Sequence, residues 1–99
     1  MATVTVWGPY VWNRAQDLIP PRGTHYHWYG PDPRINNKTV TVTAFGLDGL
    51  VSGPQFLEVV QTATRAGPGP NEFWLDIVTR NNTDRQCPYF REYISLIGP

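Results

Sequence analysis

The sequence predicts an all-β protein: a small antiparallel sandwich of six or seven strands that forms one domain over residues 1–99. Short segments alternate apolar and polar residues with a period of two, and glycines and prolines separate them at regular intervals. The chain shows neither a heptad repeat nor strands that alternate with helical segments, so parallel βαβ units are not expected. Ninety-nine residues suffice for one hydrophobic core.

The first predicted strand is interrupted. Residues 3–7 alternate and are rich in β-branched side chains, which favours a strand. A Gly-Pro pair at residues 8–9 breaks the pattern, and residues 10–12 resume it after a bulge or bend. Residues 13–23 are polar and contain two consecutive prolines, so we expect a loop with at most one helical turn at residues 15–18.

Residues 24–29 and 39–45 provide the next two strands. The glycine and prolines of residues 30–33 predict a turn after the first of them, because proline fixes φ and removes a hydrogen-bond donor. Within residues 39–45, the valines and alanine point one way and the threonines point the other. Such alternation is typical of a sheet with one buried and one solvent-facing side.

Residues 56–65 allow two interpretations. Several β-branched side chains and a period-two fit favour a strand that pairs with residues 73–79 across a loop at residues 67–70. Four apolar residues also fit the stripe of a helix that would follow a loop at residues 46–54: Phe56, Val59, Val60 and Ala63. We expect the strand, and the helix remains the alternative.

Two strands complete the chain. Residues 73–79 alternate, and the apolar side chains at their odd-numbered positions are predicted to point inward. Residues 81–84 are expected to form a turn. Residues 89–97 form the last strand, with Pro88 just before its start.

Composition narrows the possible functions. Eight basic and eight acidic residues cancel, whereas proteins that grip nucleic acid usually show a basic excess. No apolar run approaches the length of a membrane span, and the N-terminus lacks the basic and apolar segments of a signal peptide. Cys87 is the only cysteine, so an intramolecular disulfide is impossible. We expect no nucleic-acid or membrane partner, and a location that is cytoplasmic or reached by export without a signal peptide.

Five ring side chains follow one another from His25 to Tyr29, and they include both histidines of the chain. On a strand, His25, His27 and Tyr29 share one face. Tyr26 and Trp28 then share the opposite face. One face could bind a ligand while the other anchors the core, and the sequence leaves open which face is buried.

Aromatic residues of the N-terminal third are the main candidates for a binding surface. Flat rings stack on sugars or on proline-rich peptides, and their polar tips form hydrogen bonds. For any single tryptophan the core of so small a domain is the favoured place, but we expect at least one of these rings to be exposed in a patch. The predicted binding residues are Trp7, Tyr10, Trp12, His25, His27, Trp28, Tyr29, Asp32 and Arg34.

A metal site at His25 and His27 is an alternative. An H-x-H pair on a strand brings two imidazoles to one face at ligating distance, which is a common half of a zinc or copper site. A third ligand would have to come from Cys87, Asp32, Asp76 or Glu72. Because the chain has no second motif with ligand spacing, we expect no cofactor.

The sequence shows no catalytic constellation. Cys87 lacks a Cys–His motif, and the carboxylates are scattered singly. The glycines at residues 46, 49 and 53 lie outside the strand–glycine–helix context of a phosphate loop. We therefore predict that the protein is not an enzyme and has no catalytic residues.

An apolar strand at residues 73–79, an asparagine-containing turn at residues 80–83 and an aromatic-bearing strand at residues 89–97 follow one another. In this order they resemble bacterial immunoglobulin-like sandwich modules of the cell-adhesion-related kind. The resemblance covers residues 57–97, and the chain has no Cys–Trp–Cys core. It implies an immunoglobulin-like fold that serves as a spacer or binding surface, and it implies no catalytic residue.

The sequence thus predicts a non-catalytic binding or assembly module that presents an aromatic surface to a protein partner. Self-association into a homo-oligomer is expected, because pairing or stacking of subunits covers the exposed edges of small sheets. The first alternative is a carbohydrate-binding lectin that uses the same rings. The second is a small metal-binding protein that uses His25 and His27.

Overall fold

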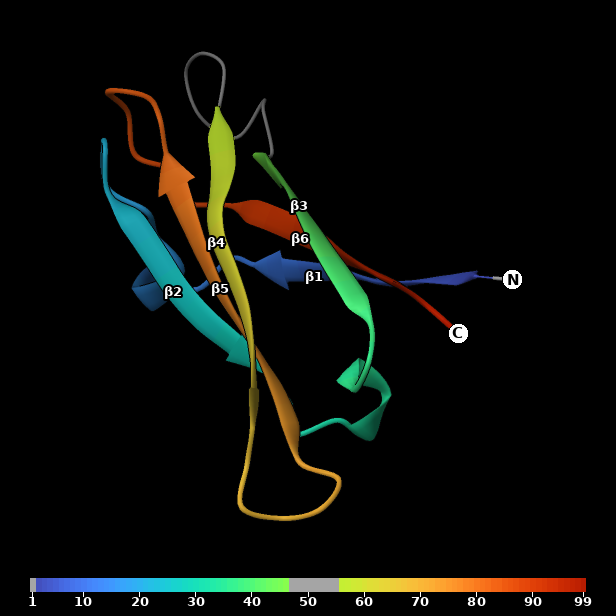
Figure 1. The fold of residues 1–99 in the computed structure, drawn as a ribbon. Helices are drawn as coiled ribbons and strands as arrows, with labels where there is room; N and C mark the ends of the chain where they lie inside the picture. Colours follow the sequence, from blue (N-terminus) through green and yellow to red (C-terminus); the bar gives the residue numbers. More distant parts are fainter. Residues whose placement is uncertain (1, 47–55) are drawn as a thin grey trace.

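The computed structural model describes residues 2–46 and 56–99 and contains two three-stranded antiparallel sheets (Figure 1). The six strands are β1 (Thr3–Trp12), β2 (Thr24–Tyr29), β3 (Thr39–Gly46), β4 (Leu57–Ala66), β5 (Phe73–Asn81) and β6 (Phe90–Gly98). One sheet has the order β1-β6-β3, and the other has the order β2-β5-β4. The predicted all-β, sandwich-like architecture is confirmed.

The irregular parts of the chain lie close to where they were expected. The pairing of β1 with β6 shifts register between Trp7 and Tyr10, at the predicted interruption. A 3₁₀ turn, η1 (Ala15–Asp17), lies in the loop that follows. A second one, η2 (Pro33–Ile35), was not predicted, and Asp32 caps it by accepting a hydrogen bond from a backbone N–H.

β4 settles the ambiguous segment. Residues 57–66 pair with β5, apart from a bulge between Val59 and Gln61, so the strand interpretation is confirmed and the helical one is wrong. The predicted loop at residues 46–54 lies, apart from Gly46, outside the described residues. Within the described ranges, no helix is long and apolar enough to cross a membrane.

The main core lies between the two sheets. It comprises Trp7, Ile35, Val42, Leu75, Ile77, Ile94 and Leu96. Leu75 and Ile77 are buried and Phe73 is half-buried, which confirms the predicted inward face of β5. Each fully buried aliphatic side chain contributes about 1.5–3 kcal/mol, so this cluster is the main source of stability.

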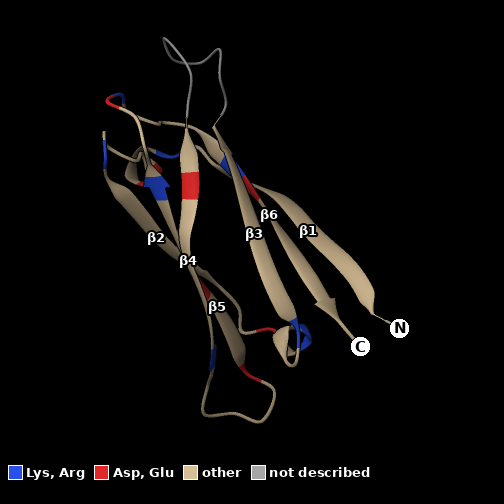
Figure 2. Ribbon diagram, turned by 45° about the horizontal axis from the view of Figure 1, so that its top comes forward, with Lys and Arg blue, Asp and Glu red and all other residues tan. Residues whose placement is uncertain are grey.

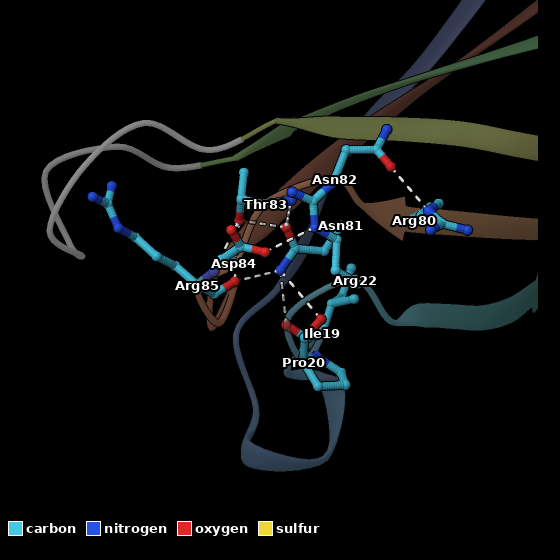
Figure 3. Close-up of polar contacts among 9 residues, drawn as sticks. All are labelled: Ile19, Pro20, Arg22, Arg80, Asn81, Asn82, Thr83, Asp84 and Arg85. Atoms are coloured by element: carbon cyan, nitrogen blue, oxygen red, sulfur yellow. Dashed lines mark hydrogen bonds and ion pairs between the residues drawn. The ribbon is translucent and has the colours of Figure 1, made fainter.

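Asn81, at the end of β5, ties two loop segments together, residues 19–20 and residues 83–85 (Figure 3). Its buried amide donates to the carbonyl oxygens of Ile19, Pro20 and Arg85, over 3.2, 3.3 and 2.6 Å. Its side-chain oxygen accepts a hydrogen bond from the Thr83 hydroxyl over 2.7 Å. These hydrogen bonds anchor the segment after η1, and hence the start of β2, to the end of β5. A second, smaller apolar cluster contains Ile19, Cys87 and Phe90.

The two lateral sides of the sandwich differ. On one side β3 and β4 contact each other and bring the two sheets together. On the other side, side chains of β1 and β2 line two adjoining cavities. The histidine-bearing stretch of β2 therefore lines both of these cavities.

Candidate functional site

Alternation along β2 sends its rings to both sides of the sheet. His25 and His27 point into the interior, where 13% and 7% of their side chains are exposed. Tyr26 and Trp28 point outward and are 56% and 54% exposed. Tyr29 is half-buried on the inner side. The structure therefore splits the predicted ring cluster into an inner and an outer group.

Five polar side chains form a continuous array in the interior, from Asp17 through both histidines to Glu92 and Thr79. His25 Nε2 lies 3.4 Å from Asp17 Oδ1, and His25 Nδ1 lies 3.1 Å from His27 Nδ1. His27 Nε2 lies 2.5 Å from Glu92 Oε1, and the Thr79 hydroxyl donates to Glu92 Oε2 over 2.9 Å. We call these five residues the buried polar array.

Electrostatics fix the charge at one end of this array. Hydrogen bonds from Arg14 hold the pKa of Asp17 below its usual range, so Asp17 is ionised at neutral pH. Burial, together with the neighbouring His27, lowers the pKa of His25 below its ordinary value of about 6.5. His25 is therefore a neutral imidazole at neutral pH.

Trp12 covers the two imidazoles from the β1 side. Its ring centroid lies 4.4 Å from that of His27 and 5.6 Å from that of His25. Among the described residues, the buried Trp12 Nε1 has no hydrogen-bond partner, and the close contact between His27 Nε2 and Glu92 Oε1 is not aligned as a hydrogen bond. Buried polar atoms left in this state are costly, and they are concentrated here.

Two cavities flank His27. A small one of about 100 Å³ lies over Glu92 and is lined by four aromatic residues, Tyr10, Trp12, Trp28 and Tyr29. A larger and more open one of about 300 Å³ reaches both imidazoles from the side of η1 and β2. Only the larger one approaches the size of ordinary ligand pockets, which begin near 300 Å³.

The outer face of the β2-β5-β4 sheet carries a group of ordered rings and charges. Trp28 and Trp74 pack edge to face with centroids 5.5 Å apart, and the Arg65 guanidinium lies 4.8 Å from the centre of the Trp74 ring. Asp76 accepts hydrogen bonds from the Tyr26 hydroxyl over 2.7 Å and from Arg65 Nε over 2.8 Å. We call these five residues the aromatic platform.

Hydrogen bonds hold the platform charged. Partial burial acts to raise the pKa of Asp76, but the hydrogen bonds from Arg65 and Tyr26 outweigh it and hold that pKa below its usual range. The hydrogen bond between Tyr26 and Asp76 also raises the pKa of the Tyr26 hydroxyl. At neutral pH the platform therefore presents an ion pair and a neutral hydroxyl beside its indole rings.

The remaining predicted binding residues lie at the end of the sheet or in the core. Asp32 is buried and pairs with Arg34, whose Nη2 lies 2.6 Å from the carboxylate. Arg34 also stacks over Trp7, 4.4 Å from the ring centre, and Trp7 is a core residue. Tyr10 and Tyr29 pack against each other with centroids 5.5 Å apart.

Sequence reasoning missed several members of both groups. Glu92 lies on the same face of its strand as Phe90 and Ile94. A carboxylate on this otherwise apolar face was the signal that could have pointed to a buried polar group. Trp74 and Asp76 occupy the even positions of residues 73–79, opposite the apolar side. Their neighbours could not be foreseen, because strand order and register, which no local pattern encodes, bring them beside β2 and β4.

In the part of the chain that the structure describes, the two histidines have no third protein ligand beside them. Within residues 2–46 and 56–99, His, Cys, Asp and Glu side chains form no group of three or more that could hold a metal ion. Cys87, one of the predicted third ligands, is buried with Ile19 and Phe90, and its thiol donates to a backbone carbonyl. A metal ion here would have two imidazole ligands from the described residues.

Comparisons of the chain with family models, with curated proteins and with solved structures find no match. A shared fold by itself would say little about function. Function is therefore inferred from the chemistry of the two groups on either side of β2.

Proposed function

We propose that the protein is a non-catalytic binding module whose aromatic platform contacts a protein partner. The observation that carries the proposal is the gathering of two tryptophans, a tyrosine and an arginine on one open sheet face. Tryptophan, tyrosine and arginine dominate the binding energy of protein interfaces. Tyr26 and Trp28 are more than half exposed, so they are available to a partner.

The platform is also ordered before any partner arrives. Arg65 is held between Asp76 and the Trp74 ring, and the Tyr26 hydroxyl is fixed by the same carboxylate. Association costs less when side chains do not lose rotamer freedom on binding. These contacts support a role in recognition in preference to incidental exposure.

A second copy of the chain is the partner that the charges favour. Basic and acidic residues are equal in number, so two copies do not repel. Charged residues of both signs are dispersed over the described ribbon and often lie near one another (Figure 2). Each three-stranded sheet also has two edge strands, and oligomerisation is one way to cover them.

The oligomeric state tests this proposal. Light-scattering mass during size-exclusion chromatography should show an oligomer for the wild type and a monomer for Trp28→Ser/Trp74→Ser. The matched control is Val4→Ser/Val6→Ser, which removes two exposed side chains, 62% and 57% exposed, from the other sheet. A wild-type monomer at high concentration, or dissociation by the control alone, would contradict self-association through the platform.

A lectin is the second candidate. The Tyr26 hydroxyl, Asp76 and Arg65 lie beside the indole rings, and such a pairing of polar groups with flat rings suits sugar recognition. A glycan array with wild type and Trp74→Ser distinguishes the candidates. Sugar binding that disappears in the variant favours the lectin, and uniform absence of binding leaves the protein interface.

We also propose that the sandwich is immunoglobulin-like. Two facts support this: the order β2-β5-β4 matches strands B-E-D of that fold, and the β3-β6 pair matches strands C-F. In this arrangement β1 occupies the edge where strand G would pair with strand F. An experimental structure whose strands follow this order in both sheets would support the kinship, and a different strand order in either sheet would contradict it.

A further inference from the structure

We propose that His25 and His27 bind one divalent transition-metal ion through their two Nδ1 atoms, with Cu²⁺ preferred over Zn²⁺. The two nitrogens lie 3.1 Å apart on neighbouring inward positions of β2. This inference concerns the inner face of the sheet and does not depend on the role of the aromatic platform.

Carboxylates assign the protons of both rings. His25 Nε2 faces Asp17, and His27 Nε2 faces Glu92. Because a carboxylate only accepts hydrogen bonds, it favours the tautomer in which the facing Nε2 carries the proton of its ring. In a neutral imidazole the other nitrogen then carries a lone pair, so both Nδ1 atoms are potential ligands.

The two lone pairs face each other. A ring that carries its proton on Nδ1 would donate it to the other Nδ1 across these 3.1 Å. When both rings carry their proton on Nε2, as the facing carboxylates favour, the two lone pairs repel unless a metal ion lies between them. A metal ion uses both lone pairs at once and leaves the contacts with Asp17 and Glu92 intact.

The spacing suits a common ion. Two nitrogens 3.1 Å apart, each about 2.0–2.1 Å from one ion, subtend an angle of roughly 100° at that ion. This angle lies between the 90° of square-planar sites and the ~109° of tetrahedral ones. Nitrogen ligands of this kind bind Cu²⁺ more tightly than Zn²⁺, which is the basis of the stated preference.

The surroundings are those of a ligating histidine pair. Metal-bound histidines usually donate their other N–H to a carboxylate, and here the Nε2 atom of each ring lies next to a carboxylate at a mostly buried position. No third protein ligand joins them among the described residues, so the remaining coordination positions fall to water or to a small donor. The cavity of about 300 Å³ lined by both imidazoles gives such donors access.

Copper titration of the untagged protein tests the site. We expect one Cu²⁺ per chain by calorimetry, and an electron paramagnetic resonance spectrum with hyperfine splitting from two imidazole nitrogens. Zn²⁺ should compete more weakly. Less than one ion per chain, or a spectrum without imidazole nitrogens, would overturn the proposal.

Variants separate ligands from their supports. His25→Gln keeps an amide donor for Asp17 but lacks Nδ1, and it should weaken Cu²⁺ binding at least about 100-fold. Asp17→Asn removes only the supporting charge and should weaken binding about 10–100-fold. Trp74→Ser on the platform should leave the affinity unchanged, and equal binding by wild type and His25→Gln would overturn the proposal.

Nitrogen-15 spectra of the wild-type imidazoles decide the question even if a variant fails to fold. We expect both rings to carry their proton on Nε2, and Zn²⁺ to shift both Nδ1 resonances. Shifts at Nε2, or a proton that stays between the two Nδ1 atoms at saturating Zn²⁺, would overturn the proposal. Loss of binding in Trp28→Ser/Trp74→Ser alone would bear on the platform and not on this site.

Discussion

The two faces of β2 hold rings of similar kinds in opposite surroundings. On the outer face, Tyr26 and Trp28 are exposed beside an ion pair that is satisfied by its own hydrogen bonds. On the inner face, His25 and His27 lie between two carboxylates, and their Nδ1 atoms face each other. The outer group can therefore meet a partner unchanged, whereas the inner group holds two ring nitrogens close enough to share one ion.

The cost of each arrangement differs as well. A buried carboxylate beside a buried polar ring contributes little net stability, because desolvation offsets the attraction, and apolar side chains often serve as well in the same place. His27 and Glu92 therefore need a reason other than stability, and ion binding at the inner face supplies one. The outer rings keep their contact with water, so they require no such compensation.

Carboxylates on the two sides should differ most in their effect on stability. Glu92→Ala leaves His27 buried beside a vacated position and should lower the free energy of unfolding by about 3–5 kcal/mol. Asp76→Ala breaks a solvent-accessible network and should cost less than about 1 kcal/mol. Urea unfolding of both variants measures the difference.

Joint replacement sharpens this prediction. His27→Leu/Glu92→Met exchanges the pair for apolar side chains and should recover most of the stability lost in Glu92→Ala. The same variant should lose Cu²⁺ binding. A double variant as unstable as the single one would mean that the pair is retained for folding and not for an ion.

Apolar side chains on the two faces should show a smaller contrast. Ile77 is 1% exposed, and Ile77→Ala should cost about 3 kcal/mol, within the range for large-to-small core changes. Trp28→Ala removes a larger but exposed side chain and should cost under about 1 kcal/mol, mainly its edge contact with Trp74. If Trp28→Ala proved as destabilising as Ile77→Ala in thermal unfolding, the outer rings would be part of the core.

Tyr10 on the inner side and Tyr26 on the outer face should respond differently to Asp76→Asn. Of the contrasts between the two sides, this one involves the smallest free energies. Burial, followed by the hydrogen bond with Tyr29, raises the pKa of Tyr10 to about 12. The hydrogen bond to Asp76 is the main cause that raises the pKa of Tyr26. Asp76→Asn should therefore lower the pKa of Tyr26 toward its ordinary value and leave that of Tyr10 at about 12.

Carbon-13 spectra of labelled tyrosine over alkaline pH measure both values. Because the folded-state pKa of Tyr10 exceeds its ordinary value, its contribution to stability is complete below about pH 10 and is lost as the pH rises through that folded-state value. An unchanged Tyr26 titration in Asp76→Asn would show that the platform network does not form in solution.

Local patterns were sufficient for the strands. Alternation placed residues 24–29, 39–45 and 73–79 correctly, and it separated the two faces of β2 without deciding which one is buried. β-Branched residues decided 57–66 in favour of a strand, because the packing of a sheet suits their restricted rotamers. The bulge in β1 followed from its Gly-Pro pair.

The site could be predicted only in part. The alternation of His25 and His27 gave the two imidazoles on one face, but their carboxylate neighbours come from η1 and β6. The platform joins Trp28 to Trp74, and that contact depends on the register of β2 with β5. Strand order and register are set by the whole core, so single-segment patterns do not contain them.

One crossed experiment tests most directly whether the two faces act independently. Wild type, Trp28→Ser/Trp74→Ser and His25→Gln are each measured for mass by light scattering and for Cu²⁺ affinity by calorimetry. If the two faces act independently, the tryptophan variant dissociates and still binds one Cu²⁺ per chain, whereas His25→Gln stays oligomeric and loses the ion. Variants that each lose both oligomerisation and Cu²⁺ binding, or that each keep both, would contradict the independence of the two faces.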